Sequence, residues 1–133
     1  MPYLKIEYTA NIEARADMGT LCKALAKILV ELKDEQGQAV FPTGGTRVLA
    51  YPAPHHAVAD AKQDYAFVYL NMRIAAGRSD AIKKRAGDAL LERTKVHFES
   101  LFSERAMGIT LQIDEGVQVY DAKHSNLHTL FSR

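Results

Sequence analysis

The chain has 133 residues, of which 17 are Lys or Arg and 16 are Asp or Glu, so its formal net charge is +1. This length fits a single domain with a core of its own, and the balanced charge argues against a general nucleic-acid or membrane-surface binder. Cys22 is the one cysteine of the sequence, which excludes an internal disulfide. Without the apolar run of a signal peptide or a membrane span, the sequence leads us to expect a soluble cytoplasmic protein.

The first eight residues predict a strand that holds the amino terminus. Leu4, Ile6 and Tyr8 alternate with their neighbours at the period of a half-buried strand. Initiator methionine is usually removed when the second residue is as small as proline, so the mature chain can begin with Pro2. Its secondary amine is then a candidate general base, although many chains begin Met-Pro with no catalytic consequence.

Residues 17–33 predict an amphipathic helix with Asp17 as its N-cap. The apolar positions that recur at helical spacing are Met18, Leu21, Cys22, Leu25, Ile28, Leu29 and Leu32. Because Cys22 lies on this stripe, we expect a small core residue there rather than a nucleophile.

Glycines and a proline mark residues 34–45 as a loop, and residues 46–51 read as a short strand. A second loop over residues 52–63 contains His55 and His56. Adjacent histidines rarely chelate a metal ion without a third ligand, and no CxxC, HExxH or carboxylate cluster accompanies them. We therefore expect no metal site.

The second half of the chain repeats the pattern of strand, helix and strand. Residues 65–74 predict the strongest strand, apolar on one face and largely aromatic on the other. Ser79 is expected to cap a helix that continues to about residue 102. Residues 109–114 alternate as a fourth strand, and the tail over residues 116–133 ends in apolar residues that suggest docking.

These elements predict a single α+β domain over residues 1–133, with one β-α-β unit at about 2–51 and a second at about 65–115. Each helix is long enough to connect two parallel strands. Two helices on one face of a four-stranded sheet leave the other face and the sheet edges uncovered. We therefore expect the protein to be an oligomer.

Two arginines occupy positions that favour anion binding. Arg47 begins the second strand, and Arg78 follows Gly77 in the turn before the second helix. An arginine fixed at such a position can bind a carboxylate through two parallel hydrogen bonds, whereas either arginine alone can simply be solubilising charge. Together with Pro2, they suggest a base beside cationic groups that receive a polyanionic substrate.

Several motifs, in order along nearly the whole chain, together resemble the 5-carboxymethyl-2-hydroxymuconate isomerase family of the tautomerase superfamily. They are residues 2–8, 41–42, 45–47, 64–68, 77–79 and 126–131. The resemblance implies two β-α-β units, a homotrimer, Pro2 as the catalytic base, and Arg47 and Arg78 as carboxylate-binding residues. The loop over residues 34–40 is longer than in the relatives, and Leu49 stands where a second basic residue is expected.

The resemblance further implies a proton shift in a small polycarboxylate substrate with no cofactor. Other activities of the superfamily, such as arylpyruvate tautomerisation or hydrating dehalogenation, use the same proline. A carboxylate-binding protein without turnover and a purely structural subunit are the alternatives outside enzymes. His124 and His128 are expected to serve tail docking or the surface rather than acid catalysis.

Overall fold

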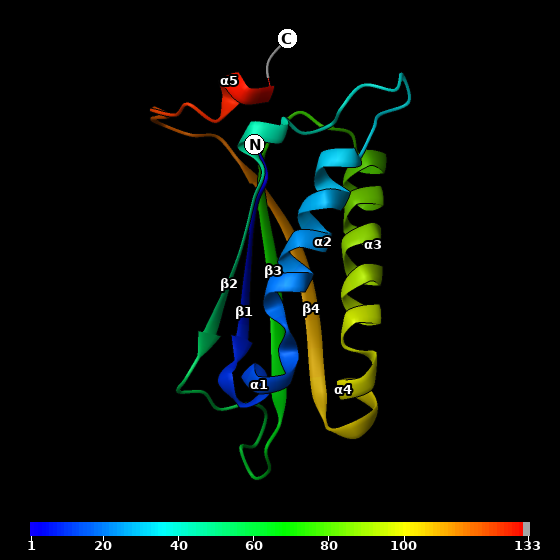
Figure 1. The fold of residues 1–133 in the computed structure, drawn as a ribbon, viewed down its shortest axis with the longest axis vertical. Helices are drawn as coiled ribbons and strands as arrows, with labels where there is room; N and C mark the ends of the chain where they lie inside the picture. Colours follow the sequence, from blue (N-terminus) through cyan, green and yellow to red (C-terminus); the bar gives the residue numbers. More distant parts are fainter. Residues whose placement is uncertain (132–133) are drawn as a thin grey trace.

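The computed structural model describes residues 1–131 of the chain. Its strands are β1 (Tyr3–Thr9), β2 (Arg47–Ala53), β3 (Ala66–Ala75) and β4 (Met107–Gly116). Its helices are η1 (Ala10–Ile12), α1 (Glu13–Ala16), α2 (Met18–Glu31), η2 (Thr43–Gly45), α3 (Asp80–His97), α4 (Glu99–Glu104) and α5 (His128–Phe131), where η marks a 3-10 helix. Figure 1 shows α2 and α3 side by side on one face of the sheet, with the amino terminus and α5 at the same end of the molecule.

The four strands form one sheet in the sequence β2-β1-β3-β4. β1 is parallel to β2 and β3 is parallel to β4, while β1 and β3 are antiparallel neighbours at the centre. Each parallel pair is joined through a helix, α2 or α3, as a crossover between parallel strands requires. The predicted α+β fold with two β-α-β units is confirmed.

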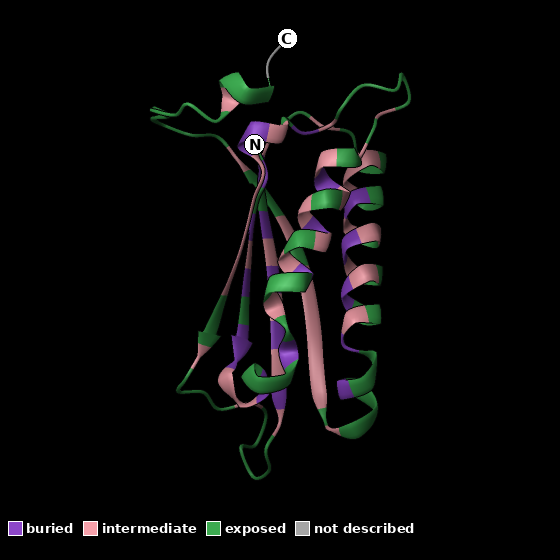
Figure 2. Cartoon of the chain, in the orientation of Figure 1, coloured by how far each residue is buried: buried purple, intermediate pink, exposed green. Residues whose placement is uncertain are grey.

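The core lies between the sheet and the two long helices. In β3, the side chains of Val68, Leu70 and Met72 are fully buried, at 0% exposure, and the residues between them are half-buried or exposed. Figure 2 shows buried residues along the central strands and on the inner faces of α2 and α3. Burying each such side chain contributes about 1.5–3 kcal/mol. This layer is therefore the rigid support for the loops at both ends of the sheet.

The second long helix begins as predicted and ends earlier. Ser79 caps it, since its Oγ accepts the backbone N–H of Ile82 at 3.2 Å. The prediction of one helix to about residue 102 is wrong, because α3 ends at His97 and α4 begins after Phe98. Phe98 leaves the helical backbone, with φ −99° and ψ 11°, and its side chain is fully buried. The break keeps this ring in the core and turns the chain toward β4.

Asp17 does not cap α2 with its side chain, which corrects the sequence prediction. Its backbone is left-handed, with φ 45° and ψ 56°, and its side chain makes no capping hydrogen bond. Its carbonyl oxygen accepts the N–H of Leu21 at 3.3 Å. Aspartate is one of the few residues other than glycine that adopt this conformation. Asp17 thus joins α2 to α1, a short helix that the apolar pattern did not indicate.

The tail after β4 stays at the end of the sheet where the chain begins, because β4 ends there (Figure 1). Its helix α5 packs against η2, and a Cβ atom added at Gly44 would lie 2.9 Å from the Cα atom of His128. The last two residues of the predicted docking tail, 132–133, lie outside the described residues. Within residues 1–131, no helix is long and apolar enough to cross a membrane.

Candidate active site at the amino terminus

Pro2 is buried at the start of β1. Its carbonyl oxygen accepts the backbone N–H of Arg47 at 3.1 Å, so hydrogen bonding between β1 and β2 begins at this residue. With Met1 attached, the Pro2 nitrogen is an amide nitrogen without a proton and cannot act as a base. Removal of Met1 would give a secondary amine at this buried position.

Met1 lies directly in front of the Pro2 nitrogen, because the two residues are covalently joined. Its side chain is next to η2, since a Cβ atom added at Gly45 would be 3.1 Å from Met1 Cγ. The same Cβ position is 3.5 Å from Cε1 of His128 in α5. The Met1 side chain, η2 and the tail helix α5 therefore lie close together at this end of the sheet.

The electrostatic surroundings of the terminus are mainly positive. Burial lowers the pKa of the Met1 amino group, the positive charges of Arg78 and then Lys123 lower it further, and the negative charge of Asp121 raises it. The Pro2 nitrogen is bonded to Met1, so we expect these charges to influence an amine at Pro2 as well.

Arg78 lies in the turn between β3 and α3. Its Nη1 donates to the carbonyl oxygen of Ala75 at 3.3 Å, and its Nη2 donates to the carbonyl oxygen of Val40 at 3.2 Å. Its guanidinium carbon lies 4.6 Å from the centre of the buried Phe41 ring, within the range of a cation–π contact. Burial lowers the pKa of Arg78, but a guanidinium stays charged at neutral pH.

Arg47 is joined to the site through its backbone, and its side chain turns toward η2. Its Nη1 donates to the carbonyl oxygens of Gly44 at 2.8 Å and Thr46 at 3.0 Å. In the sheet register it pairs with Tyr3, whose side chain lies on the face without helices. The structure therefore places Arg78 within electrostatic range of the terminus and places Arg47 beside Pro2 along the sheet edge.

Neither of these arginines forms an ion pair within the described part of the chain, where the ion pairs involve other lysines and arginines. The hydrogen bonds of Arg47 and Arg78 go to backbone carbonyl oxygens. Both side chains are half-buried, and a partly buried charge is stabilised by an opposite charge. An anionic ligand at this end of the sheet would supply it.

Sequence analysis missed two charged residues of the tail that belong to this end of the molecule. Lys123 Nζ and Asp121 Oδ2 form an ion pair at 2.6 Å, and both charges act on the amino terminus. The tail has no strand or helix periodicity at these positions, so no local pattern indicated that it returns to the site. His128 lies against Gly44.

The other chemically reactive residues lie elsewhere. His55 and His56 are in the loop between β2 and β3, at the opposite end of the sheet (Figure 1). Burial raises the pKa of the half-buried Cys22 thiol, which disfavours a nucleophilic thiolate. No group of three His, Cys, Asp or Glu side chains in the described residues could hold a metal ion.

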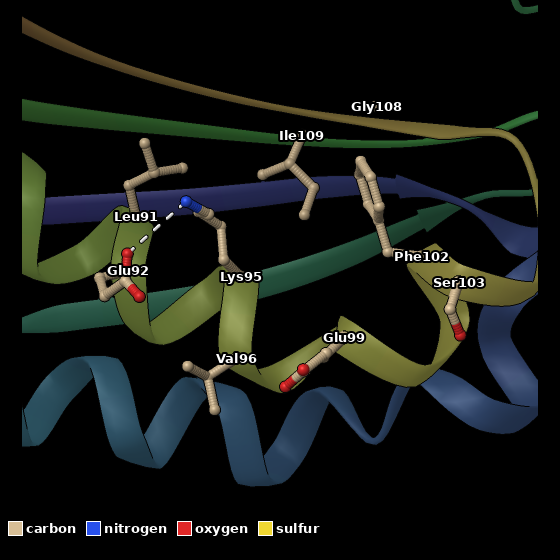
Figure 3. Close-up of a pocket in the computed structure, with 9 residues that line it drawn as sticks. All are labelled: Leu91, Glu92, Lys95, Val96, Glu99, Phe102, Ser103, Gly108 and Ile109. Atoms are coloured by element: carbon tan, nitrogen blue, oxygen red, sulfur yellow. Dashed lines mark ion pairs between the residues drawn. The ribbon is translucent and has the colours of Figure 1, made fainter.

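Two hollows differ in their relation to the terminus. A groove of about 800 Å³ lies between α3, α4 and β4, and Figure 3 shows that it is lined by apolar side chains such as Leu91, Phe102 and Ile109, with Lys95 paired to Glu92. A smaller hollow of about 500 Å³ lies between α2, η2 and α5, lined by residues that include Phe41, Pro42, Gly44, His128 and Phe131. The smaller hollow adjoins the ring beneath Arg78, so it is the one connected to the candidate site.

Comparisons with known proteins identify the family of the chain. Residues 2–131 match the family model described as 5-carboxymethyl-2-hydroxymuconate isomerase. A protein of Escherichia coli named 5-carboxymethyl-2-hydroxymuconate Delta-isomerase is 32% identical over 131 residues, covering 98% of this chain and 99% of the relative.

Solved structures give the same result. A crystal structure of a 5-carboxymethyl-2-hydroxymuconate delta-isomerase matches with a TM-score of 0.94 and 46% identity, covering 100% of this chain and 94% of the other. An isomerase of the same name from Deinococcus radiodurans R1 matches with a TM-score of 0.88 and 32% identity, covering 99% of this chain and 95% of the other. At 19% identity, a fused 4-OT that forms a symmetric trimer shares the fold, with a TM-score of 0.59 and coverage of 91% and 93%.

The matched range of residues, the identity to the named isomerases and the shared fold thus lead to one conclusion. The chain is an isomerase that belongs to the 5-carboxymethyl-2-hydroxymuconate isomerase family, with the tautomerase fold.

Proposed function

We propose that the chain, once Met1 is removed, isomerises 5-carboxymethyl-2-hydroxymuconate or a similar 2-hydroxydienoate, with the Pro2 nitrogen as general acid and base. One observation supports this proposal most directly: Pro2 is buried at the start of β1, and the charge of Arg78, a half-buried cation with no acidic partner among the described residues, acts on the amino group of the adjacent Met1. The names of the relatives supply the substrate class.

The reaction needs only a proton carrier. The neutral Pro2 nitrogen takes the proton of the 2-hydroxyl group, which leaves a dienolate whose negative charge is shared between oxygen and the conjugated carbon chain. The protonated nitrogen then returns the proton to a carbon of that chain, and the product is an unsaturated ketone. The base is regenerated in the same cycle.

The surroundings of the terminus favour the neutral form of the amine. Burial and the positive charge of Arg78 both lower the pKa of the Met1 amino group, and we expect the same influences on a Pro2 amine one residue further along the chain. A general base works best when its pKa is close to the working pH, and an unperturbed α-amino group has a pKa of about 8. The lowered pKa therefore brings more of the amine into the reactive form near neutral pH.

The two arginines are assigned to the substrate anion. Arg78 is held by two backbone carbonyl oxygens and by the Phe41 ring, so its guanidinium is already oriented when a carboxylate or the dienolate oxygen arrives. Such preorganised donors contribute about 3 kcal/mol each to transition-state stabilisation. Arg47, at the start of β2, is assigned to a second carboxylate.

We also propose that the protein is a homotrimer. The edge strands β2 and β4 have unpaired sides, and Tyr3 and Tyr51 are exposed at 42% and 45%. Exposed strand edges are usually covered in native proteins. The symmetric trimer formed by the fused 4-OT of the same fold supports this assembly.

The experiment that tests the function compares the processed protein with a form whose terminus is blocked. Mass spectrometry of the purified protein should show a mass without Met1. A variant with one extra residue that stays in front of Pro2 should lose about 10²- to 10⁴-fold in kcat, the contribution of a general base. Isomerisation would be followed by ultraviolet absorbance.

Pro2→Ala is a milder change than the blocked terminus, because it keeps a terminal amine. It should still lose much of the activity. Full activity of the blocked form would refute the role of Pro2. A purified protein that retains Met1 and binds the substrate without converting it would instead be a carboxylate-binding protein.

A further inference from the structure

His128 is the residue by which the tail contacts the rest of the chain. Residues 117–127 and 129–131 are exposed, whereas His128 is half-buried. A Cβ atom added at Gly44 would lie 2.9 Å from its Cα atom and 3.1 Å from its Nδ1 atom. Gly44 and Gly45 are buried in η2 and have no positive φ, so glycine serves here to allow a close approach. The side chain of His128 thus lies directly on the backbone of η2.

The same histidine lies near Met1 above Gly45. The Cβ position of Gly45 is 3.1 Å from Met1 Cγ and 3.5 Å from His128 Cε1, so both side chains border one methyl-sized position. Cε1 is the ring carbon between the two nitrogens, and Nδ1 is near Gly44. The imidazole therefore turns its nitrogen-bearing edge toward η2, on the side where the chain begins.

The arginines of the candidate site are connected to the same short helix. Arg47 Nη1 donates to the carbonyl oxygen of Gly44 at 2.8 Å. Phe41, whose ring lies 4.6 Å from the guanidinium carbon of Arg78, lines the hollow of about 500 Å³ together with Gly44 and His128. Packing and cavity lining therefore place His128 at the end of the sheet that holds both arginines and the terminus (Figure 1).

Removal of Met1 would free the space that the substrate has to enter. To exchange a proton with the Pro2 nitrogen, the reacting atoms of the substrate must come within hydrogen-bond distance of it, into the volume that Met1 now fills. The Met1 side chain borders the His128 ring, so substrate atoms that replace it border the same ring. An imidazole has an N–H donor whether it is neutral or protonated. Such a donor suits the oxygen on which negative charge develops.

We propose that His128 is a catalytic residue that donates a hydrogen bond to the 2-oxygen of the substrate and stabilises the dienolate. The proposal rests on the proposed function, in which the O–H bond of the 2-hydroxyl group breaks as Pro2 takes the proton. The electron pair left on oxygen spreads over the diene, and the returned proton forms a C–H bond. His128 keeps its own proton throughout. This role is additional to the docking of the tail, and it makes α5 part of the active site.

The central test is His128→Phe, which keeps an aromatic ring on η2 and removes both nitrogens. With 5-carboxymethyl-2-hydroxymuconate, kcat should fall about 10- to 100-fold, the effect of losing a hydrogen bond to a charged group. KM should change less than about threefold, because the charge develops only in the transition state. His128→Gln should recover part of kcat, since its side-chain amide is again a donor. Ultraviolet absorbance measures both constants.

Two controls separate this chemistry from docking of the tail. Amide exchange of residues 126–131 should be the same in His128→Phe and in the unaltered protein, because a ring still packs on η2. His124→Phe is the matched control, since His124 is exposed in the same tail and is not among the residues that line the hollow. Its kcat and KM should stay within about twofold of the unaltered protein.

The imidazole nitrogens give a readout that does not need turnover. Excess 5-carboxymethyl-2-hydroxymuconate should shift the ¹⁵N resonances of the His128 ring, which are identified by their absence in His128→Phe, and should leave those of His124 in place. If the unaltered protein does not convert this compound, the proposed function fails, and the same titration still tests whether the ring contacts the ligand.

Three results would overturn the proposal. One is an unchanged kcat in His128→Phe, and another is a set of His128 ring resonances that do not respond to the compound. The third is a loss of activity that is equal in His128→Phe and His128→Gln and is accompanied by faster amide exchange of the tail in both. That result would limit His128 to docking.

Discussion

Arginines at the two ends of the sheet differ in their hydrogen-bond partners. At the end formed by α4 and the loop before β3, Arg105 Nη2 donates to the Asp64 carboxylate at 2.8 Å and to the Asp64 carbonyl at 2.6 Å. Asn11 Nδ2 donates to the other carboxylate oxygen of Asp64 at 2.9 Å. At the end where the chain begins, Arg78 donates only to backbone carbonyl oxygens.

These partners indicate a structural role for Arg105 and leave the charge of Arg78 available to an anionic ligand. The positive charge of Arg105 is neutralised by Asp64, and the hydrogen bonds between them connect the end of α4 to the loop before β3. The charge of Arg78 has no such partner among the described residues, although its position is equally well fixed. An enzyme for anions needs the second arrangement, since a guanidinium already paired with a carboxylate would have to be released first.

The largest expected effect is on catalysis, at the amino-terminal end. Arg78→Ala should raise KM for the anionic substrate by about 10- to 100-fold, because a hydrogen bond to a charged group is worth about 1.5–3 kcal/mol. The free energy of unfolding should change little, since the partners left behind are two backbone carbonyls near solvent. Substrate titrations of initial rate and chemical denaturation measure the two quantities. Unchanged KM and kcat would remove Arg78 from the site.

The pH dependence of Arg78→Ala gives a second readout. The positive charge of Arg78 lowers the pKa of the terminal amino group, so its removal should raise that pKa. The base is active when deprotonated, and activity is lost as pH falls through its pKa. The acidic limb of kcat/KM should therefore move to higher pH in the variant. A shift to lower pH would contradict the electrostatic role.

The matched change at the opposite end should affect stability and leave catalysis intact. Arg105→Ala removes two hydrogen bonds to Asp64 from a side chain that is 22% exposed. The expected loss is about 1–2 kcal/mol in the free energy of unfolding, with KM and kcat within twofold of the unaltered protein. Urea denaturation and the absorbance assay test this pair of outcomes. A large rise in KM would show that the two ends are coupled.

Local patterns predicted the scaffold because the core imposes them directly. The alternation of Val68, Leu70 and Met72 identifies a strand with one face under the helices, and the Ser79 cap marks the start of α3. The break at Phe98 could not be predicted from periodicity, since it depends on where β4 must begin. Asp17 was misread for a similar reason: its left-handed backbone is set by the packing of α1.

The candidate site was predictable only in part. Pro2, Arg47 and Arg78 lie at strand ends or turns, where sequence signals are strong, and the roles assigned to them remain proposals. The packing of α5 against η2 was missed, because it is a contact between segments far apart in the sequence. Long-range contacts of irregular segments leave no periodic trace.

A smaller effect is expected on the pH dependence of stability, through Asp64 at the opposite end of the sheet. Hydrogen bonds from Asn11 and Arg105 lower the pKa of Asp64, below the value of about 3.9 expected when unfolded. Its stabilisation is therefore present above about pH 4 and is lost as pH falls through the folded-state pKa. Asp64→Asn should lower the melting temperature at neutral pH, and the difference from the unaltered protein should narrow toward pH 3. A constant difference across this range would exclude Asp64 ionisation as its cause.

The smallest expected effect concerns the tail that closes the amino-terminal end. In Gly44→Ala the new methyl group would lie 2.9 Å from the backbone Cα atom of His128, so α5 must move away from η2. Since α5 is only His128–Phe131 and has no buried residue, the loss of global stability should stay below about 1 kcal/mol. Amide exchange of the tail should become faster.

Gly19→Ala is the matched control, because a Cβ atom there meets nothing within 4 Å. Alanine is favoured over glycine in a helix by up to about 1 kcal/mol, so this variant should be neutral or slightly more stable, with unchanged exchange in the tail. If Gly44→Ala leaves tail exchange unchanged as well, the contact with η2 does not hold the tail. The position of the tail in solution would then be set by contacts other than the one between α5 and η2.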